Sequence, residues 1–409
     1  MKYLFFSPYN VIDDWRYSER LLQDTLSSKK DEVRIISCSS ILKENCIAID
    51  AHTKIYKSKF IKDLICTRCI KNKKFYMGDN IDYNIDDYIS EKDHLKIEKI
   101  IKNINKKNFL KFSYNKFKIG KIALFENFLK NKKNNFVFKY NEYEEIKKSI
   151  KNILFLYFAL EKIVKDYSPD IVISQNGNYS LSKFFSEYFN KRGAYSYAWE
   201  ASNNYHDRFG RIFICKNDMN SGFNYLKNNW KKIQKKQKFY YKDLLNVRKH
   251  MFTIMNAKAL RSFSKSYNKS EKSIREIYQV QDDKKIVLAA TSSWDEVIGT
   301  YVLKGQPFNK LMIFKDQIDW IKNIIDFFSK NEKYFLIIRV HPRDANNKNS
   351  LLVKFLNKYE NLPENIKINL PSDKISLYSI FKNCDLVLNG WSTLGIEAGY
   401  FNIPLKRIT

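Results

Sequence analysis

The sequence predicts an α/β protein with two domains, each built on a parallel β-sheet with helices on its faces. Short apolar runs typical of buried strands alternate with amphipathic helical segments in both halves of the chain. In addition, 409 residues are more than a single hydrophobic core ordinarily organises. We expect an N-terminal domain over residues 1–224, a basic helical connection over 225–284 and a C-terminal domain over 285–409.

The N-terminal half begins as an alternating α/β segment. Strands are expected at Lys2–Phe6 and Val33–Ser37, with an amphipathic helix at Asp14–Ser27 between them. Residues 50–150 are rich in Lys and Asn, and their pattern is hard to assign before a long helix at Tyr143–Tyr167. This part therefore reads as an insertion in the first domain.

A βαβ unit follows the long helix. Its elements are the strand Asp170–Ser174, the helix Ser180–Arg192 and the strand Ala194–Trp199. The first strand is followed by Asn176 and Gly177, and the second by Glu200. Since open α/β sheets bind ligands at the carboxyl edge of the sheet, these three residues mark a candidate site.

The C-terminal half repeats this alternation of strands and helices. Strands are expected at Ile286–Ala290, Tyr334–Val340, Ile366–Leu370 and Leu386–Leu388, with helices at Asp316–Asn331, Ser350–Tyr359 and Lys374–Lys382. Such an alternation predicts parallel pairing of the strands. The second sheet should therefore also collect the loops after its strands at one carboxyl edge.

Polar residues end or follow three of these strands. They are Ser292 and Ser293, then Arg339, His341 and Arg343, and finally Ser392, Thr393 and Glu397. Cations, an imidazole and hydroxyls at a helix start suit a phosphate or diphosphate. Thr393 and Glu397 share one helix face. The Thr393 hydroxyl would then contact the phosphate, and the Glu397 carboxylate would contact a ribose diol. Two further acids, Asp295 and Glu296, could hold a metal but are equally favoured in the first turn of a helix.

Two of these motifs resemble a known family. His341-Pro342 and the segment Ser392–Ala398 are similar to the nucleotide-sugar half of bacterial capsule and surface-polysaccharide biosynthesis proteins, and Phe117–Leu124 resembles an Ile-Gly-x-x-Ala segment of the same proteins. These are glycosyltransferases of the GT-B type, and bacterial sialyltransferases share the His-Pro feature. The resemblance implies two Rossmann-like domains facing a central cleft. The second domain would bind the nucleotide sugar, and the first would bind the acceptor near Asn176 and Gly177.

The resemblance also implies a reaction. The chain is expected to transfer a sugar from a CMP-, UDP- or GDP-linked donor to a capsular or lipid-linked surface glycan, with no cofactor and no metal. Glu200 is the first candidate for the general base, and Asp13, Asp14 and His206 are alternatives. The alternative functions are a glycerol-phosphate or other phosphoryl transferase with a CDP-linked donor, and an inactive truncated partner protein. In the family, another strand and further helices follow the segment ending at Pro404, so the C-terminal domain is expected to be truncated.

Charge and apolar runs limit the partners and the location. Lys and Arg outnumber Asp and Glu by 73 to 44, which gives a net charge of +29. The basic residues are scattered and form no nucleic-acid-binding motif, so we expect modest attraction to an anionic membrane surface and no nucleic-acid partner. No apolar run matches a bilayer span or a signal-peptide core, which predicts a cytoplasmic protein at the inner membrane face. Its cysteines are then expected as thiols, Cys66 and Cys69 forming only a weak zinc motif.

Overall fold

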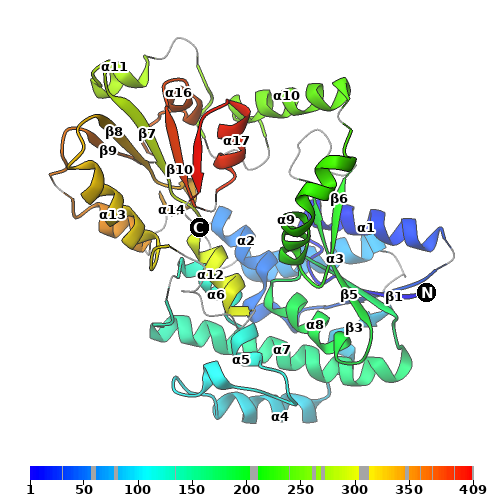
Figure 1. Ribbon diagram of the computed structural model, residues 1–409. Coiled ribbons are helices and arrows are strands. Elements are labelled where there is room, and N and C mark those ends of the chain that lie inside the picture. The colour runs from blue at the N-terminus through cyan, green and yellow to red at the C-terminus, as the bar shows by residue number, and fades with distance from the viewer. Residues whose placement is uncertain are drawn as a thin grey trace. The chain divides into compact units, whose positions relative to one another are not determined.

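The computed structural model divides into two compact units (Figure 1). It describes residues 1–29, 31–56, 61–77, 82–133, 135–202, 211–238, 240–259, 264–268, 272–303, 313–345, 350–359, 361–370, 372–390 and 392–407. The first unit is built mainly from residues before 238, and the second from residues after it together with Phe128–Phe136. Each unit has its own sheet and its own hydrophobic core.

The sheet of the first unit has the order β3-β2-β1-β4-β5-β6. Its strands are β1 (Lys2–Phe6), β2 (Glu32–Ser37), β3 (Tyr83–Asn84), β4 (Ile171–Gln175), β5 (Tyr195–Ala201) and β6 (Ile212–Lys216). All neighbours pair in parallel except β5 and β6, which are antiparallel. The order reverses between β1 and β4, so the ligand-binding point expected of such a sheet lies at the carboxyl ends of these two strands.

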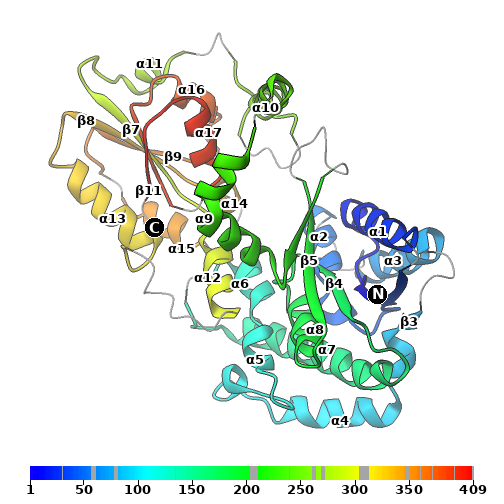
Figure 2. The ribbon, with the colours of Figure 1, turned by 45° about the vertical axis from the view of Figure 1, so that its right-hand side comes forward.

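Helices cover both faces of this sheet (Figure 2). The helices in this part of the chain are α1 (Asp13–Ser27), α2 (Ile47–Tyr56), α3 (Ile61–Met77), α4 (Glu91–Lys102), α5 (Ile119–Ile122), α6 (Phe125–Asn131), α7 (Tyr140–Asp166), α8 (Ser180–Asn190) and α9 (Met219–Lys236). Of these, α4 packs on α7, and α6 from Phe128 onward belongs to the second unit. Trp15 of α1 and Ile65 of α3 pack against Phe5 and Trp199 on one face. On the other face, α8 stacks its Phe185 on Phe6 of β1. Alternate strand residues therefore enter two separate apolar layers.

The sheet of the second unit has the order β11-β10-β7-β8-β9, and all its pairs are parallel. Its strands are β7 (Lys285–Ala290), β8 (Tyr334–Arg339), β9 (Ile366–Asn369), β10 (Leu386–Asn389) and β11 (Leu405–Arg407). Counted along the chain, this is the 3-2-1-4-5 order of a Rossmann-type sheet, which reverses between β7 and β10. A ligand is therefore expected at the carboxyl ends of these two strands.

The helices of the second unit also lie on both faces of its sheet. They are α10 (Tyr241–Met255), α11 (Ile274–Tyr278), α12 (Trp294–Leu303), α13 (Gln317–Phe328), α14 (Pro342–Ala345), α15 (Leu351–Leu356), α16 (Leu377–Phe381) and α17 (Leu394–Tyr400). One core joins Leu288 and Ile337 to α11, α16 and α17. The other joins Val287 and Ile338 to α13 and α15.

The structure confirms the predicted class of fold, two α/β units with mostly parallel sheets. Lys2–Phe6 is a strand as expected, and each strand predicted in the C-terminal half is present, with ends that differ by a residue. Leu405–Arg407, beyond the last strand assigned from the pattern, adds β11 beside β10. That the two sheets face a cleft stays a prediction. No helix within the described residues is both long and apolar enough to cross a bilayer.

Candidate functional site

The carboxyl ends of the strands in the second unit form one row. The register pairs Ala290 of β7 with Arg339 of β8 and with Asn389 of β10, and Arg339 with Asn369 of β9. Neighbouring strands are about 4.8 Å apart, so β8 and β10 lie roughly 10 Å from each other on the two sides of β7. The predicted residues after β7, β8 and β10 therefore start from the same edge of the sheet.

Thr291 ties the loops after β7 and β8 together. Its hydroxyl donates to the carbonyl of Arg339 at 3.2 Å and accepts the backbone N–H of His341 at 2.8 Å. The next residue, Ser292, donates its backbone N–H to the Gln317 side chain at 2.8 Å. Ser293 then leads directly into α12. Thr291 was not singled out from the sequence, because a threonine after a strand carries no signal of its own.

The ring of His341 is positioned as a neutral hydrogen-bond donor. Its Nδ1 accepts the backbone N–H of Arg343 at 3.2 Å, which places the proton of the neutral imidazole on Nε2. Burial, and to a smaller extent the nearby Lys132 ammonium, lower the pKa of His341 to about 4. At neutral pH the ring can therefore supply an N–H group to a phosphate oxygen but no charge.

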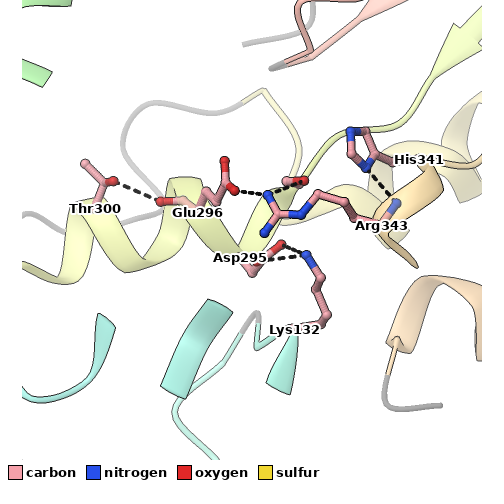
Figure 3. A network of polar contacts seen from close by, with 7 residues as sticks. Lys132, Asp295, Glu296, Thr300, His341 and Arg343 are labelled. Carbon is pink, nitrogen blue, oxygen red and sulfur yellow. Dashed lines mark hydrogen bonds and ion pairs between the residues drawn. The ribbon is translucent and has the colours of Figure 1, made fainter. Parts of the chain in front are cut away.

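Arg343 joins the same network from the start of α14. Its Nη1 forms an ion pair with Glu296 in the first turn of α12 and contacts the Ser293 hydroxyl at 3.4 Å (Figure 3). Both charged side chains are partly exposed, so solvent screens their attraction. A ligand phosphate at this edge would compete with Glu296 for the Arg343 guanidinium.

Lys132 contributes a second cation, which was not expected from the sequence. It follows α6, and its Nζ lies 3.1 and 3.0 Å from the two carboxylate oxygens of Asp295 (Figure 3). The side chains are only 8% and 3% exposed. The pair lines a cavity of about 30 Å³ together with Ser292 and Asp344. Burial raises the pKa of the Asp344 carboxyl to about 6, an effect that Lys132 opposes.

The loop after β10 is held by its own polar groups. The Asn389 side chain donates to the Ser392 carbonyl at 2.8 Å and accepts the Ser392 backbone N–H at 3.3 Å. The Ser392 hydroxyl accepts the backbone N–H of Leu394 at 3.3 Å, whereas Thr393 makes no side-chain capping bond. A Cβ at Gly395 would lie 2.5 Å from the Asn389 side-chain nitrogen. Glycine there allows the close approach that fixes this loop.

Arg339 and Glu397 lie on one face of the sheet, apart from the Arg343 network. The Arg339 guanidinium donates to Asn369 at 2.6 Å, and burial lowers its pKa to about 10. Tyr378 donates its hydroxyl to Glu397 at 2.8 Å. Burial raises the pKa of Glu397, while Tyr378 and Arg339 act in the opposite direction. The predicted pairing of Glu397 with a ribose diol would therefore have to share this carboxylate with Tyr378.

Glu200, the predicted base, is bound by the turn after β4. The side-chain amides of Gln175 and Asn176 donate to the same carboxylate oxygen at 2.9 and 3.0 Å. Asn176 and Gly177 both have positive φ, 62° and 75°, and a Cβ at Gly177 would lie 2.6 Å from a backbone oxygen. The two amide donors hold the Glu200 carboxylate in place at the end of β4.

The alternative bases differ in their surroundings. Asp13 forms an ion pair with Arg16 at 2.8 Å, and Asp14 follows it in the first turn of α1. His206 lies outside the described residues. A residue not considered from the sequence, Glu126, accepts the backbone N–H of Ser180 at 2.7 Å and also its hydroxyl proton. Burial raises the pKa of Glu126 to about 7, which is the range a general base needs.

Four cysteines of the first unit line a small apolar cavity of about 20 Å³. They are Cys38, Cys46, Cys66 and Cys69. Burial raises the pKa of Cys46 to about 12 and that of Cys69 to about 11. The thiolate is the form that ligates metals and attacks electrophiles, so the raised pKa values of Cys46 and Cys69 disfavour both reactions at neutral pH.

The strand order and the polar carboxyl edge together define the second unit as a Rossmann-type sheet with an edge site suited to an anion. No protein-family model and no curated protein matches the chain. Among solved structures it is similar to S. aureus MnaA in a co-structure with UDP, at 12% identity over 99% of this chain and 79% of that chain, with a TM-score of 0.29.

Two further likenesses are equally weak. The spinosyn rhamnosyltransferase SpnG, complexed with spinosyn aglycone, is 10% identical over 99% of this chain and 79% of that chain, with a TM-score of 0.22. Leishmania major tyrosyl-tRNA synthetase is 8% identical over 100% of this chain and 94% of that chain, with a TM-score of 0.28. Proteins of different activity thus score alike, and the class of fold rests on the strand order alone.

Proposed function

We propose that the chain is a glycosyltransferase whose second unit binds the diphosphate or monophosphate of a nucleotide sugar. The observation that carries the proposal is the joining of the loops after β7 and β8, where Thr291, His341 and Arg343 meet the first turn of α12. Ser392 and Thr393 start from the same edge on the other side of β7. Hydroxyls, a neutral imidazole N–H and a guanidinium are groups that bind phosphate oxygens.

In this proposal the groups at the edge stabilise the nucleotide as it leaves. Negative charge develops on the leaving phosphate during sugar transfer, and fixed donors at that position lower the barrier. His341 would donate from Nε2, Arg343 would add charge, and Lys132 would add a more distant field. A carboxylate of the first unit would take the proton of the acceptor hydroxyl, with Glu200 proposed first and Glu126 second. A surface-glycan acceptor and action at the inner membrane face belong to the same proposal.

Calorimetry with CMP, CDP, UDP and GDP tests the nucleotide site directly. His341→Ala should weaken binding by about 1–3 kcal/mol, because it removes a hydrogen bond to a charged group. His341→Gln should retain part of the binding free energy that His341→Ala loses, because the glutamine amide can still donate a hydrogen bond. A matched control is His94→Gln on α4 of the first unit, which should bind like the wild type. If none of the four nucleotides binds more tightly than millimolar, the proposal fails.

The ionisation of His341 gives a second check on the same site. Its lowered pKa of about 4 means that the ring stays neutral from pH 8 down to pH 6. The wild-type protein and His341→Gln should therefore show the same change of affinity over this range, because any ionisation of the nucleotide cancels between them. A wild-type affinity that rises selectively below pH 6.5 would mean that a charged imidazole binds the ligand.

A further inference from the structure

Helix α10 (Tyr241–Met255) has an apolar face that its own unit covers only at the C-terminal end of the helix. At about 100° per residue, one arc of the helix carries apolar side chains and the opposite arc carries polar ones. The exposed apolar residues are Tyr241 (75%), Leu244 (62%), Leu245 (45%), Val247 (48%) and Phe252 (67%). Exposed apolar surface of this extent on one element marks an interaction site.

Only the end of α10 is anchored in the second unit. Met251 is buried in the core beneath the sheet, and Ile254 and Met255 pack against the same core. From Tyr241 to Lys249, by contrast, every residue except Asp243 is exposed. Asp243 accepts the backbone N–H of Tyr240 at 2.9 Å and so fixes the start of the helix. The helix is thus held at its end and capped at its start, while the apolar side chains of its first two turns are exposed.

The charges on and before α10 are almost all positive. Basic residues on the helix are Lys242, Arg248 and Lys249, and those just before it in the chain are Lys231, Lys232, Lys235, Lys236 and Lys238. Asp243 is the single acid among residues 225–255, and its carboxylate caps the helix. Lys242 and Lys249 border the apolar arc, and Arg248 lies within it. A long arginine side chain can lie along apolar surface and still place its charge in a polar layer.

We propose that α10 docks in the interfacial layer of an anionic lipid bilayer. A bilayer surface offers acyl chains to Leu244 and Phe252 and anionic headgroups to Arg248 and Lys249 at the same time. Nucleic acid would match the cations but has no apolar layer for the leucines. A second copy of the chain would match the apolar face but would bring two sets of cations together. This inference rests on the proposed action at a membrane face and assigns it to α10, but it does not depend on the nucleotide site.

The test is sedimentation of the full chain with vesicles of phosphatidylcholine alone and with added phosphatidylserine, in the absence of nucleotide. The protein should bind the mixed vesicles and bind the neutral ones far more weakly. Changing Lys242, Arg248 and Lys249 to Gln should lower the partition coefficient on mixed vesicles about 100-fold, at roughly fivefold per charge near the surface. The double change Leu244→Ser and Phe252→Ser should lower the partition coefficient at least about tenfold, on either kind of vesicle to which the wild type binds.

Helix α4 (Glu91–Lys102) provides matched controls. Leu95 is an exposed leucine, and Lys92, Lys99 and Lys102 are exposed lysines on that helix. Leu95→Ser and the triple change of these lysines to Gln should leave vesicle binding within about twofold of the wild type, because they keep the α10 face intact. Equal losses in the α4 and α10 variants would overturn the proposal, since binding would then follow net charge alone.

Two other results would also overturn it. In light scattering, a wild-type dimer that Leu244→Ser converts to a monomer, without binding to mixed vesicles, would assign the face to a second copy. Binding to a nucleic-acid oligomer that the Leu244→Ser and Phe252→Ser variant retains, with no vesicle binding, would assign the cations to nucleic acid. Nucleotide calorimetry on the same variants separates this outcome from failure of the glycosyltransferase proposal, because α10 contributes none of the edge residues.

Discussion

The two sheets share one strand order, but the residues at the point where that order reverses differ in charge. In the first unit, Glu126 caps the start of α8, the helix that follows β4, and Glu200 is bound by the turn after the same strand. In the second unit, the corresponding edge carries hydroxyls, the His341 imidazole and cations. One edge therefore already holds the chain's own carboxylates, and the other holds groups that attract an external anion.

This difference distinguishes two roles, binding of a phosphate and acceptance of a proton, which the fold alone does not assign to either unit. A carboxylate that occupies a helix start takes the place of a bound phosphate, so the first sheet is unsuited to bind one there. It is suited to accept a proton instead, and Glu126 has the raised pKa for that. In the second unit, Asp295 and Glu296 neutralise the cations internally. An incoming phosphate there competes with acids of the protein and not with water alone.

The largest expected effect concerns the two carboxylates of the first unit. Replacing the true general base by Gln should lower turnover about 10²- to 10⁴-fold with nucleotide affinity nearly unchanged. We expect this result for Glu200→Gln or for Glu126→Gln, and initial rates with calorimetry on both variants decide between them. Glu200 is held in place by two amide donors, and Glu126 has a pKa raised by burial to about 7.

Asp24→Asn is the control for this pair, because Asp24 on α1 is exposed and paired with Arg20 and is not a candidate base. It should keep turnover near that of the wild type. If both Gln variants remain fully active, the role of base passes to Asp13, Asp14 or His206, and neither carboxylate at this edge of the first sheet supplies it.

The next largest effect is expected for the Lys132–Asp295 pair. Its two single variants should change nucleotide affinity in opposite directions, which a purely structural pair would not do. Lys132→Met leaves a buried negative charge near the edge and should weaken nucleotide binding roughly tenfold. Asp295→Asn leaves the ammonium unopposed and should strengthen it. The double variant should lie between them. A purely structural pair would instead show weakened binding in both single variants, because each leaves a buried charge without its partner.

The titration of His341 provides an independent measure of the same field. Because the Lys132 ammonium lowers the pKa of His341, Lys132→Met should raise that pKa in NMR spectra of the ring protons. Lys133→Met, a change at the neighbouring residue that also lines the cavity, is the matched control. An unchanged His341 titration in Lys132→Met would show that the ammonium does not act at the site.

The sequence predicted the sheets well and the site only in part, for a physical reason. Strands such as β7 and β8 are buried on both faces and therefore appear as continuous apolar runs, and polar residues at their ends are local signals. Lys132 and Glu126 lie in the Lys- and Asn-rich insertion, more than 50 residues from the partners they meet. Their role depends on burial and on distant contacts, and neither leaves a periodic pattern in the sequence.

The last prediction concerns the stability of the first unit. It tests whether a second carboxyl group of this unit, that of Glu19, is protonated when buried. Glu19 of α1 is buried near Ser7 and Trp199, and burial raises its pKa to about 8. The folded protein thus binds a proton more tightly than the unfolded chain, whose Glu titrates near 4.5. This contribution to stability is present below pH 4.5 and is lost as the pH rises to 8.

Glu19→Gln should remove this pH dependence of stability and, above pH 8, raise the free energy of unfolding by about 1–3 kcal/mol. Urea denaturation at several pH values measures this, with Glu91→Gln on the exposed start of α4 as the control. A wild-type stability that rises between pH 5 and 8 in step with Glu19→Gln would show that Glu19 is charged in the folded state, and the buried acid would then need a cation beside it.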